Sequence, residues 1–223
     1  MQNSRGTPPK RPPYERRFFH DPEATGIFYL GREIAHVMGH EGADWLDRPE
    51  REEEEGIRLL VRSIGLKPGM VVADIGAGSG TISFLMAPFV GTSGRILAVD
   101  IQTEMLDVIR RKKRENGDRV VEPVLGRVDD PNLKPASVDL ILLVDVYHEF
   151  DHPWEMTRAM VDALRPGGRL VLVEYRKEDA SVPIKESHKM SVAQVRKEMA
   201  LFPLSFVTNI SVLPRQHILV FKK

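Results

Sequence analysis

The stretch Val71-Val72-Ala73-Asp74-Ile75-Gly76-Ala77-Gly78-Ser79-Gly80 decides the fold of this chain. Its β-branched start predicts a buried strand, and an aspartate lies near the carboxyl end of that strand. Three glycines at alternating positions then allow a sharp turn and let the backbone approach a ligand without an intervening Cβ. A helix is predicted next, because Ile82, Leu85 and Met86 recur at helical spacing. The stretch therefore predicts a strand, a ligand-binding turn and a helix.

The composition excludes several classes of function. Lysine plus arginine and aspartate plus glutamate each total 32, so no net charge attracts the chain to nucleic acid or to an anionic membrane. The absence of cysteine excludes disulfides, thiolate metal ligands and thiol nucleophiles. No apolar run approaches the roughly 18 residues that span a bilayer, and no apolar block of a signal peptide follows the basic N-terminus. We expect a cytoplasmic protein with no nucleic-acid or membrane partner; a leader removed from the natural protein stays an open alternative.

The length of 223 residues suits one large α/β domain with an N-terminal extension. Residues 1–20 are rich in proline and arginine, which predicts a flexible or surface-bound arm. Residues 21–56 are predicted to form a helical cap or lid. Residues 57–223 are predicted to form the ligand-binding domain, with strands and helices in alternation: strands at 70–75, 95–100, 120–124, 138–145 and 168–175, and helices near 79–90, 103–116 and 152–164.

This alternation predicts a doubly wound, mostly parallel sheet with helices on both faces. A further helix is expected near 191–201. The final strands, 205–212 and 217–221, flank a short turn at 213–216 and are therefore predicted to pair as an antiparallel hairpin. The sheet is expected to contain seven strands.

Asp100 is the second candidate ligand residue, next to Ile101. It ends the strand predicted at 95–100 and lies twenty residues past Gly80. An acid at about this spacing hydrogen-bonds a ribose diol in nucleotide-binding sheets, because a carboxylate accepts two hydrogen bonds from adjacent hydroxyls. The alternative is an aspartate that caps a turn, but the glycine loop favours the ribose role.

These features together resemble the class I S-adenosylmethionine (AdoMet)-dependent methyltransferases, over roughly residues 57–175. The dinucleotide fingerprint G-x-G-x-x-G needs a glycine where Thr81 stands, and the chain has D-x-G-x-G-x-G instead. The resemblance implies AdoMet as the cofactor. It also implies that Val128 and Asp129 contact the adenine, although Asp130 or a plain exposed turn stays possible there. The full set of AdoMet-binding residues that the resemblance implies is Asp74, Gly76, Gly78, Gly80, Asp100, Ile101, Val128, Asp129 and Asp145.

Within this superfamily the chain is similar to small-molecule methyltransferases. The Asn-Pro-Pro-aromatic motif of enzymes that methylate nucleic-acid amino groups is absent after the fourth strand. The segment 147–150 is similar to the His-Asp-Trp stretch of plant-type O-methyltransferases. This similarity implies that His148 deprotonates an acceptor hydroxyl and that Glu149 orients the imidazole of His148. An imidazole suits this task near neutral pH. A role for His148 in capping or shape alone stays open.

The N-terminal segment contributes further candidate residues. We expect a lid in which four side chains, together with Tyr147, face the cofactor and the acceptor: Tyr29, Arg32, His36 and His40. A purely structural helix is the alternative. The pairs His36–His40 and His148–His152 are each spaced i, i+4, but no third ligand is spaced to complete a metal site, so none is predicted.

Two charged runs are interpreted as solvated helix ends. The basic run at 110–114 complements the dipole at the end of a helix and lacks the interleaved aromatic residues of a nucleic-acid platform. The acidic run Glu52–Glu55 suits the first turn of a helix.

The predicted function is transfer of a methyl group from AdoMet to a small-molecule acceptor, at oxygen, with nitrogen or carbon as the alternative acceptor atoms. One alternative is an NAD-dependent oxidoreductase on a similar sheet, against which the missing third glycine argues. A second is a non-catalytic AdoMet-binding protein, which the detection of turnover would exclude. The sequence identifies neither the acceptor nor the oligomeric state.

Overall fold

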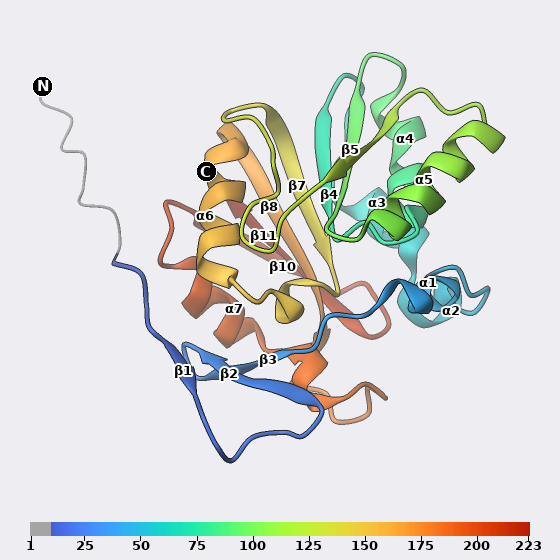
Figure 1. The fold of residues 1–223 in the computed structure, drawn as a ribbon. Coiled ribbons are helices and arrows are strands. Elements are labelled where there is room, and N and C mark those ends of the chain that lie inside the picture. Colours follow the sequence, from blue (N-terminus) through green and yellow to red (C-terminus); the bar gives the residue numbers. More distant parts are fainter. Residues whose placement is uncertain (1–9) are drawn as a thin grey trace, which may run out of the picture.

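The computed structural model describes residues 10–223, and its centre is a sheet between two layers of helices (Figure 1). Seven strands lie in the order β10-β11-β8-β7-β4-β5-β6. The run from β8 to β6 is parallel, and β11 pairs antiparallel with both β8 and β10. The bounds are β4 (Val71–Ile75), β5 (Arg95–Asp100), β6 (Val121–Leu125), β7 (Val138–Val144), β8 (Leu164–Arg176), β10 (Ser205–Ile210) and β11 (Gln216–Lys222). The predicted seven-stranded sheet and its final hairpin are confirmed.

An eighth, very short strand lies where the sheet ends. Strand β9 (Lys189–Met190) pairs in parallel with Tyr175 and Arg176, the last two residues of β8. The pairing of β7 with β8 stops earlier, at Val144 and Val173. The chain before β9 is therefore held beyond the carboxyl end of β7.

Helices cover both faces of the sheet, as the alternating pattern predicts. One face carries α3 (Ile57–Ser63), α4 (Thr81–Val90) and α5 (Thr103–Glu115), whose apolar residues share a core cluster with alternate residues of β4, β5 and β8. The other face carries α6 (Pro153–Ala163) and α7 (Val192–Met199), which pack in a second cluster. Figure 1 shows these two layers on opposite sides of the strands.

The N-terminal segment differs from the prediction. Residues 1–9 of the predicted arm lie outside the described residues. The following residues form a separate three-stranded antiparallel sheet of β1 (Tyr14–Arg16), β2 (Ala24–Tyr29) and β3 (Arg32–Ala35). The helical prediction for residues 21–35 is therefore wrong, because Leu30 and Gly31 take φ values of +50° and +96° and close a tight two-residue hairpin.

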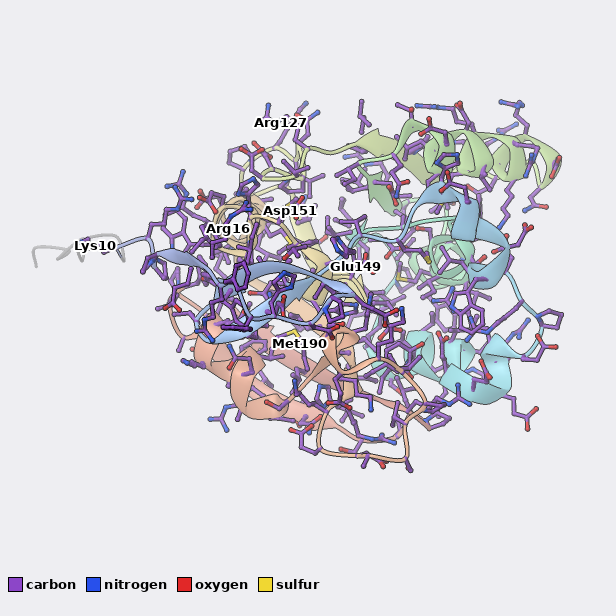
Figure 2. The ribbon with its side chains drawn as sticks, turned by 60° about the horizontal axis from the view of Figure 1, so that its bottom comes forward. Lys10, Arg16, Arg127, Glu149, Asp151 and Met190 are labelled. Atoms are coloured by element: carbon purple, nitrogen blue, oxygen red, sulfur yellow. The ribbon has the colours of Figure 1, made fainter. Side chains whose placement is uncertain are left out.

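This small sheet, which we call the N-terminal sheet, packs tightly against the main domain. Tyr29 and Ile34 are fully buried in a cluster with Trp154 and Phe202, and the hydroxyl of Tyr14 donates to Glu155 over 2.6 Å. Figure 2 views the molecule from this side and shows the strands of the N-terminal sheet crossing in front of it.

Short helices follow the N-terminal sheet. They are the 3-10 turn η1 (His40–Gly42), α1 (Ala43–Leu46) and α2 (Arg51–Glu55), so the predicted helical cap exists only from residue 40 onward. None of the helices within residues 10–223 combines the length and the apolar character needed to cross a bilayer.

Candidate active site

A cavity of about 440 Å³ lies at the carboxyl ends of β4, β5 and β7, where ligands bind in parallel sheets of this kind. One part, the glycine side, is formed by the turn after β4 and by Asp100. The opposite part, the histidine side, is formed by His148, Glu149 and His188. A roof over both comes from residues 37–55, which contribute Met38, Trp45, Leu46, Arg51 and Glu55.

The glycine side requires glycine for steric reasons. Gly76 and Gly78 line the cavity and have φ values of +69° and +53°, which glycine adopts at little cost. A Cβ on Gly76 would overlap the side chain of Val146, and a Cβ on Gly78 would overlap Leu46. Glycine is therefore needed at both positions, for the backbone conformation and for the close packing of Val146 and Leu46 against the turn.

Asp100 has the position expected of it on the glycine side. Its Oδ2 accepts the amide proton of Gly78 over 2.8 Å, and its Oδ1 accepts that of Gln102 over 2.9 Å. Burial raises the pKa of this carboxyl group. Asp100 and Ile101 both line the cavity, so the carboxylate joins the glycine turn to a place where a hydroxyl could bind.

Two residues of the predicted loop lie beneath the cavity and do not line it. Asp74 is buried and accepts the hydroxyl proton of Ser83 over 2.6 Å, and burial raises its pKa to about 6. Gly80 begins α4, and a Cβ there would lie 2.8 Å from Ile109. Both residues shape the loop from behind.

The turn after β6 differs in detail from the prediction. Asp129 does not line the cavity; it is exposed and lies 3.5 Å from the guanidinium of Arg127. The cavity is lined instead by Arg127 and Val128. The tight turn from Arg127 to Asp130, closed by an amide–carbonyl hydrogen bond of 2.8 Å, directs Asp129 outward.

Asp145, which follows β7, lines the cavity, is half-buried and has a strained backbone. Its φ is +50°, a value that residues other than glycine rarely adopt. Its Oδ2 accepts a proton from the amide of Gln216 over 3.0 Å, while its Oδ1 has no hydrogen-bond partner among residues 10–223. Burial and the nearby carboxylates of Glu55 and Glu174 raise its pKa well above the usual range.

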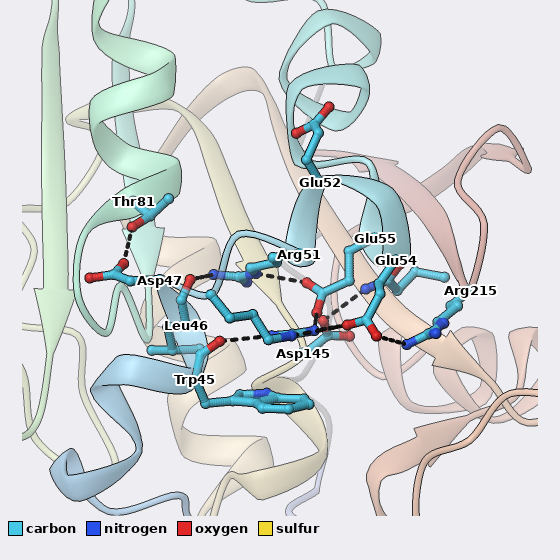
Figure 3. Close-up of polar contacts among 12 residues, drawn as sticks. Trp45, Leu46, Asp47, Arg51, Glu52, Glu54, Glu55, Thr81, Asp145 and Arg215 are labelled. Carbon is cyan, nitrogen blue, oxygen red and sulfur yellow. Dashed lines mark hydrogen bonds and ion pairs between the residues drawn. The ribbon is translucent and has the colours of Figure 1, made fainter.

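A buried charge network lies beside Asp145 in Figure 3. Glu55 accepts protons from Arg51 over 2.8 Å, from Arg48 over 2.6 Å and from the hydroxyl of Tyr175 over 3.0 Å. Because Glu55 is 3% exposed, its interpretation as part of a solvated turn is wrong. Arg48 also stacks on the ring of Trp45, with 3.6 Å between its Cζ and the ring centre.

The roof is fastened to the glycine turn through Asp47. This carboxylate accepts protons from the hydroxyls of Ser79, over 2.6 Å, and of Thr81, and it pairs with Lys112 over 2.5 Å. These bonds lower its pKa. Ser79 and Thr81 directly follow Gly78 and Gly80. The loop and the roof are therefore held together by side chains that lie within and next to the glycine motif.

The histidine side is a compact group of hydrogen-bonding side chains. Nδ1 of His148 lies 2.6 Å from Oε2 of Glu174, and Nε2 lies 3.1 Å from Nδ1 of His188. Oε1 of Glu149 lies 3.8 Å and 3.6 Å from the same two facing nitrogens. The second oxygen of Glu149 accepts the amide proton of Met38 over 3.3 Å.

Burial governs the protonation of these groups. It lowers the pKa of His148 and that of His188 to about 4 each, and it raises the pKa of Glu174 to about 8. It also raises the pKa of Glu149.

Arg32 and Tyr147 hold the histidine side in place from outside the cavity. The guanidinium of Arg32 pairs with the buried carboxylate of Glu198 over 2.7 Å and donates to the carbonyl of His148 over 3.1 Å. The hydroxyl of Tyr147 donates to Glu198 over 2.7 Å. Neither residue lines the cavity, so both support the site and are not part of a lid.

The other residues predicted for a lid also lie outside the cavity. Tyr29 is fully buried and stacks beside Tyr14, with 5.4 Å between ring centres. His36 and His40 are exposed and do not line the cavity. The hairpin explains the difference, because it ends at Ala35 and directs the segment after it, not the hairpin itself, over the cavity.

Residues 73–172, from β4 into β8, match the family model described as a methyltransferase domain. The matched region contains the glycine turn, Asp100, Asp145 and His148. Residues 73–172 of the chain thus form a class I AdoMet-dependent methyltransferase domain.

Two methyltransferases are similar in sequence to this chain over part of their length. The chain is 30% identical over 121 residues to the ubiquinone/menaquinone biosynthesis C-methyltransferase UbiE of Vibrio campbellii, which covers 54% of this chain and 47% of that protein. UbiE of Pseudomonas paraeruginosa is 28% identical over 155 residues, covering 68% and 58%. The chain thus spans about half the length of these relatives.

Solved structures agree on the fold. An AdoMet-dependent methyltransferase from Aquifex aeolicus superposes with a TM-score of 0.78 at 22% identity, over 83% of this chain and 99% of that one. The [4+2]-cyclase SpnF superposes with a TM-score of 0.64 at 15% identity, over 75% and 80%. Because a cyclase shares the fold, the reaction has to be argued from the site.

The cavity fits the cofactor of this family, AdoMet. The two glycines line the cavity without a side chain, Asp100 offers a carboxylate for hydroxyl groups, and Asp145 has a buried oxygen without a hydrogen-bond partner among the described residues. The volume of about 440 Å³ lies in the range of ligand pockets.

Several lining residues of this methyltransferase were not predicted. Arg51 and Glu55 of the roof form a charged network with Tyr175, and His188 completes the histidine side. The i, i+4 spacing of Arg51 and Glu55 is a sequence signal that could have indicated an ion pair. No local pattern marks His188, which reaches the site only because β9 pairs with the end of β8.

Proposed function

We propose that this chain transfers the methyl group of AdoMet to an oxygen atom of a small-molecule acceptor bound on the histidine side. The observation that carries the proposal is the pair His148–Glu174, with 2.6 Å between Nδ1 and Oε2, because it leaves Nε2 of His148 directed to the cavity. A cavity of about 440 Å³ suits a small acceptor beside the cofactor.

We assign the binding of AdoMet to the glycine side. Gly76 and Gly78 would accept the close approach of the cofactor, and Asp100 would bind the ribose hydroxyls. Val128 would lie against the adenine, with Arg127 beside it. These roles are supported by the lining of the cavity.

The amino-acid end of AdoMet carries one positive and one negative group, and the chain offers a partner for each. Asp145 would bind the ammonium group, which would offset the cost of burying its carboxylate among other acids. Arg51, which lines the cavity and uses Nε and one terminal nitrogen for Glu55 and Leu46, would bind the carboxylate.

AdoMet supplies an electrophilic methyl group on a sulfonium centre, and the remaining requirements fall on the chain. The acceptor oxygen must be held about 3 Å from the methyl carbon and in line with the leaving sulfur. Its proton must also be removed. Nε2 of His148 would accept it once the acceptor hydroxyl takes the place of the 3.1 Å contact with His188, while Glu174 holds the ring. Glu149, 3.8 Å from Nε2, would orient the acceptor hydroxyl.

A carbon acceptor is the second candidate, because the relatives named above are C-methyltransferases. A base in the same position could remove a proton from an activated carbon acid. The chemical identity of the product decides between the two.

The test is incubation of the chain with methyl-labelled AdoMet and metabolite extracts, followed by identification of the labelled product. We expect an O-methylated small molecule and one S-adenosylhomocysteine per methyl group transferred. His148→Ala should slow the chemical step by about 10²–10⁴-fold, whereas His40→Ala, an exposed histidine outside the cavity, should not change it. Binding of AdoMet without any labelled product would overturn the proposal and favour a non-catalytic AdoMet-binding protein.

A further inference from the structure

Three side-chain atoms of the histidine side surround one point at the edge of the cavity. They are Nε2 of His148, Nδ1 of His188 and Oε1 of Glu149, separated by 3.1, 3.6 and 3.8 Å. Zinc bonds to nitrogen and oxygen are about 2.0–2.2 Å long, so two ligands at a tetrahedral angle lie about 3.4 Å apart. The three atoms already have the spacing of three corners of a zinc tetrahedron.

Two of these three side chains also form a hydrogen bond through the atom that faces away from the common point, as metal-binding side chains usually do. Nδ1 of His148 is bonded to Glu174, and Oε2 of Glu149 accepts the amide proton of Met38. A carboxylate behind a metal-binding histidine fixes the orientation of the ring and strengthens the ligand. Glu174 is itself fixed, because the amide of Tyr147 donates to its Oε1 over 3.0 Å.

The charge of the group also points to a divalent cation. Glu149 and Glu174 are both buried, and among residues 10–223 neither forms an ion pair with a lysine or an arginine. The charges around them are already matched, because Arg32 pairs with Glu198 over 2.7 Å and Lys185 pairs with Glu23 over 3.0 Å. A divalent ion at this place would therefore have two buried carboxylates close to it that no lysine or arginine already pairs with.

We propose that His148, Glu149 and His188 bind a zinc-class divalent ion and leave its fourth position open to the cavity. Two imidazoles and one carboxylate favour zinc or a neighbouring transition metal over magnesium and calcium, which prefer oxygen ligands. The three residues are the one group of this kind within the described part of the chain. Of the two histidine pairs noticed in the sequence only His148 contributes, because His36, His40 and His152 lie outside the cluster.

The use of this ion rests on the proposed function. A hydroxyl bound at the open position loses its proton more readily, since the ion stabilises the resulting oxygen anion. The oxygen–methyl bond then forms as the sulfur–methyl bond of AdoMet breaks, and the acceptor proton leaves to water. In the zinc-bound protein His148 is thus a ligand, and the role of proton acceptor applies only to the metal-free protein.

The test is zinc binding by tag-free protein that has been dialysed against a chelator, measured in competition with a chromophoric indicator. We expect one zinc per chain, and with Co²⁺ the intense visible bands of a four-coordinate ion. His148→Ala and His188→Ala should each weaken zinc binding by more than the about 10–100-fold expected for the supporting variant Glu174→Gln. His40→Ala is the matched control and should bind zinc as the wild type does.

If His148→Ala misfolds, His188→Ala still tests the proposal. Because the side chain of His188 is 24% exposed, His188→Ala should keep its circular dichroism spectrum even if His148→Ala does not. Wild-type protein that binds no more zinc than His188→Ala would overturn the proposal and leave the 3.1 Å contact as a hydrogen bond between two imidazoles. The assay contains neither AdoMet nor acceptor, so zinc binding without methyl transfer refutes only the proposed function, and methyl transfer without zinc binding refutes only the metal site.

Discussion

The glycine side and the histidine side of one cavity are built in different ways. The glycine side comes from neighbouring residues, with Asp100 bonded to the backbone of Gly78 and the loop shaped by its own φ angles. The histidine side joins residues far apart in the chain, since Glu174 and His188 lie 26 and 40 residues from His148. One side therefore depends on backbone geometry, and the other on buried side chains that must all be present together.

The largest effect is expected where the histidine side depends on a buried ion pair. Arg32→Met leaves the carboxylate of Glu198 buried and unpaired, which typically costs about 3–5 kcal/mol. The double variant Arg32→Met/Glu198→Gln should recover most of this loss, because glutamine carries no charge and still accepts the hydroxyl proton of Tyr147. Urea unfolding measures both variants. Equal stability of the single and double variants would show that the ion pair does not hold the N-terminal sheet in place.

Behind the glycine side, Asp74 is a buried carboxyl group whose ionisation should cost stability. Burial raises the pKa of Asp74 from 3.8 to about 6, so its contribution to stability is full below about pH 4 and is lost as the pH rises through 6. The free energy of unfolding of the wild type should therefore fall relative to Asp74→Asn by up to about 3 kcal/mol between pH 4 and 7. A constant difference across this range would leave the glycine side dependent on backbone alone.

A smaller effect is expected from an alanine in the glycine turn, where steric overlap can be distinguished from backbone strain. Gly76→Ala places a Cβ where Val146 stands, and displacing the loop should weaken AdoMet binding roughly 100-fold. Gly117→Ala is the matched control, because Gly117 has a similar φ of +62°, has nothing within 4 Å of the place that a Cβ would occupy, and does not line the cavity. Both variants should lose stability through the strained φ, Gly76→Ala more because of the overlap with Val146, and only Gly76→Ala should lose AdoMet affinity. Equal affinities would remove the steric argument for the glycine.

The same contrast explains what could be predicted from the sequence. The strands of the main sheet, the turn at Gly76 and Gly78, and Asp100 follow from local patterns, and the structure has them at the predicted places. The N-terminal hairpin was missed because Ile27, Leu30 and Ile34 have helical spacing, while the turn at Leu30 lacks the asparagine or aspartate that usually marks it.

On the histidine side the sequence indicated the residues but not their partners. His148 and Glu149 are adjacent and follow a predicted strand, so the strand tip could be identified. Glu174 and His188 could not, because their place depends on the pairing of β8 with β7 and β9. Such long-range register leaves no local pattern in the chain.

The most direct test of the division into two sides is equilibrium dialysis of labelled AdoMet against wild-type protein, Asp100→Ala and His148→Ala. The account predicts one site in the wild type and a loss of about 1–3 kcal/mol of binding free energy in Asp100→Ala, because bonded groups lose their partner. It predicts a change of no more than about twofold in His148→Ala, as expected for independent sites. No AdoMet binding by the wild type, or an equal loss in both variants, would contradict it.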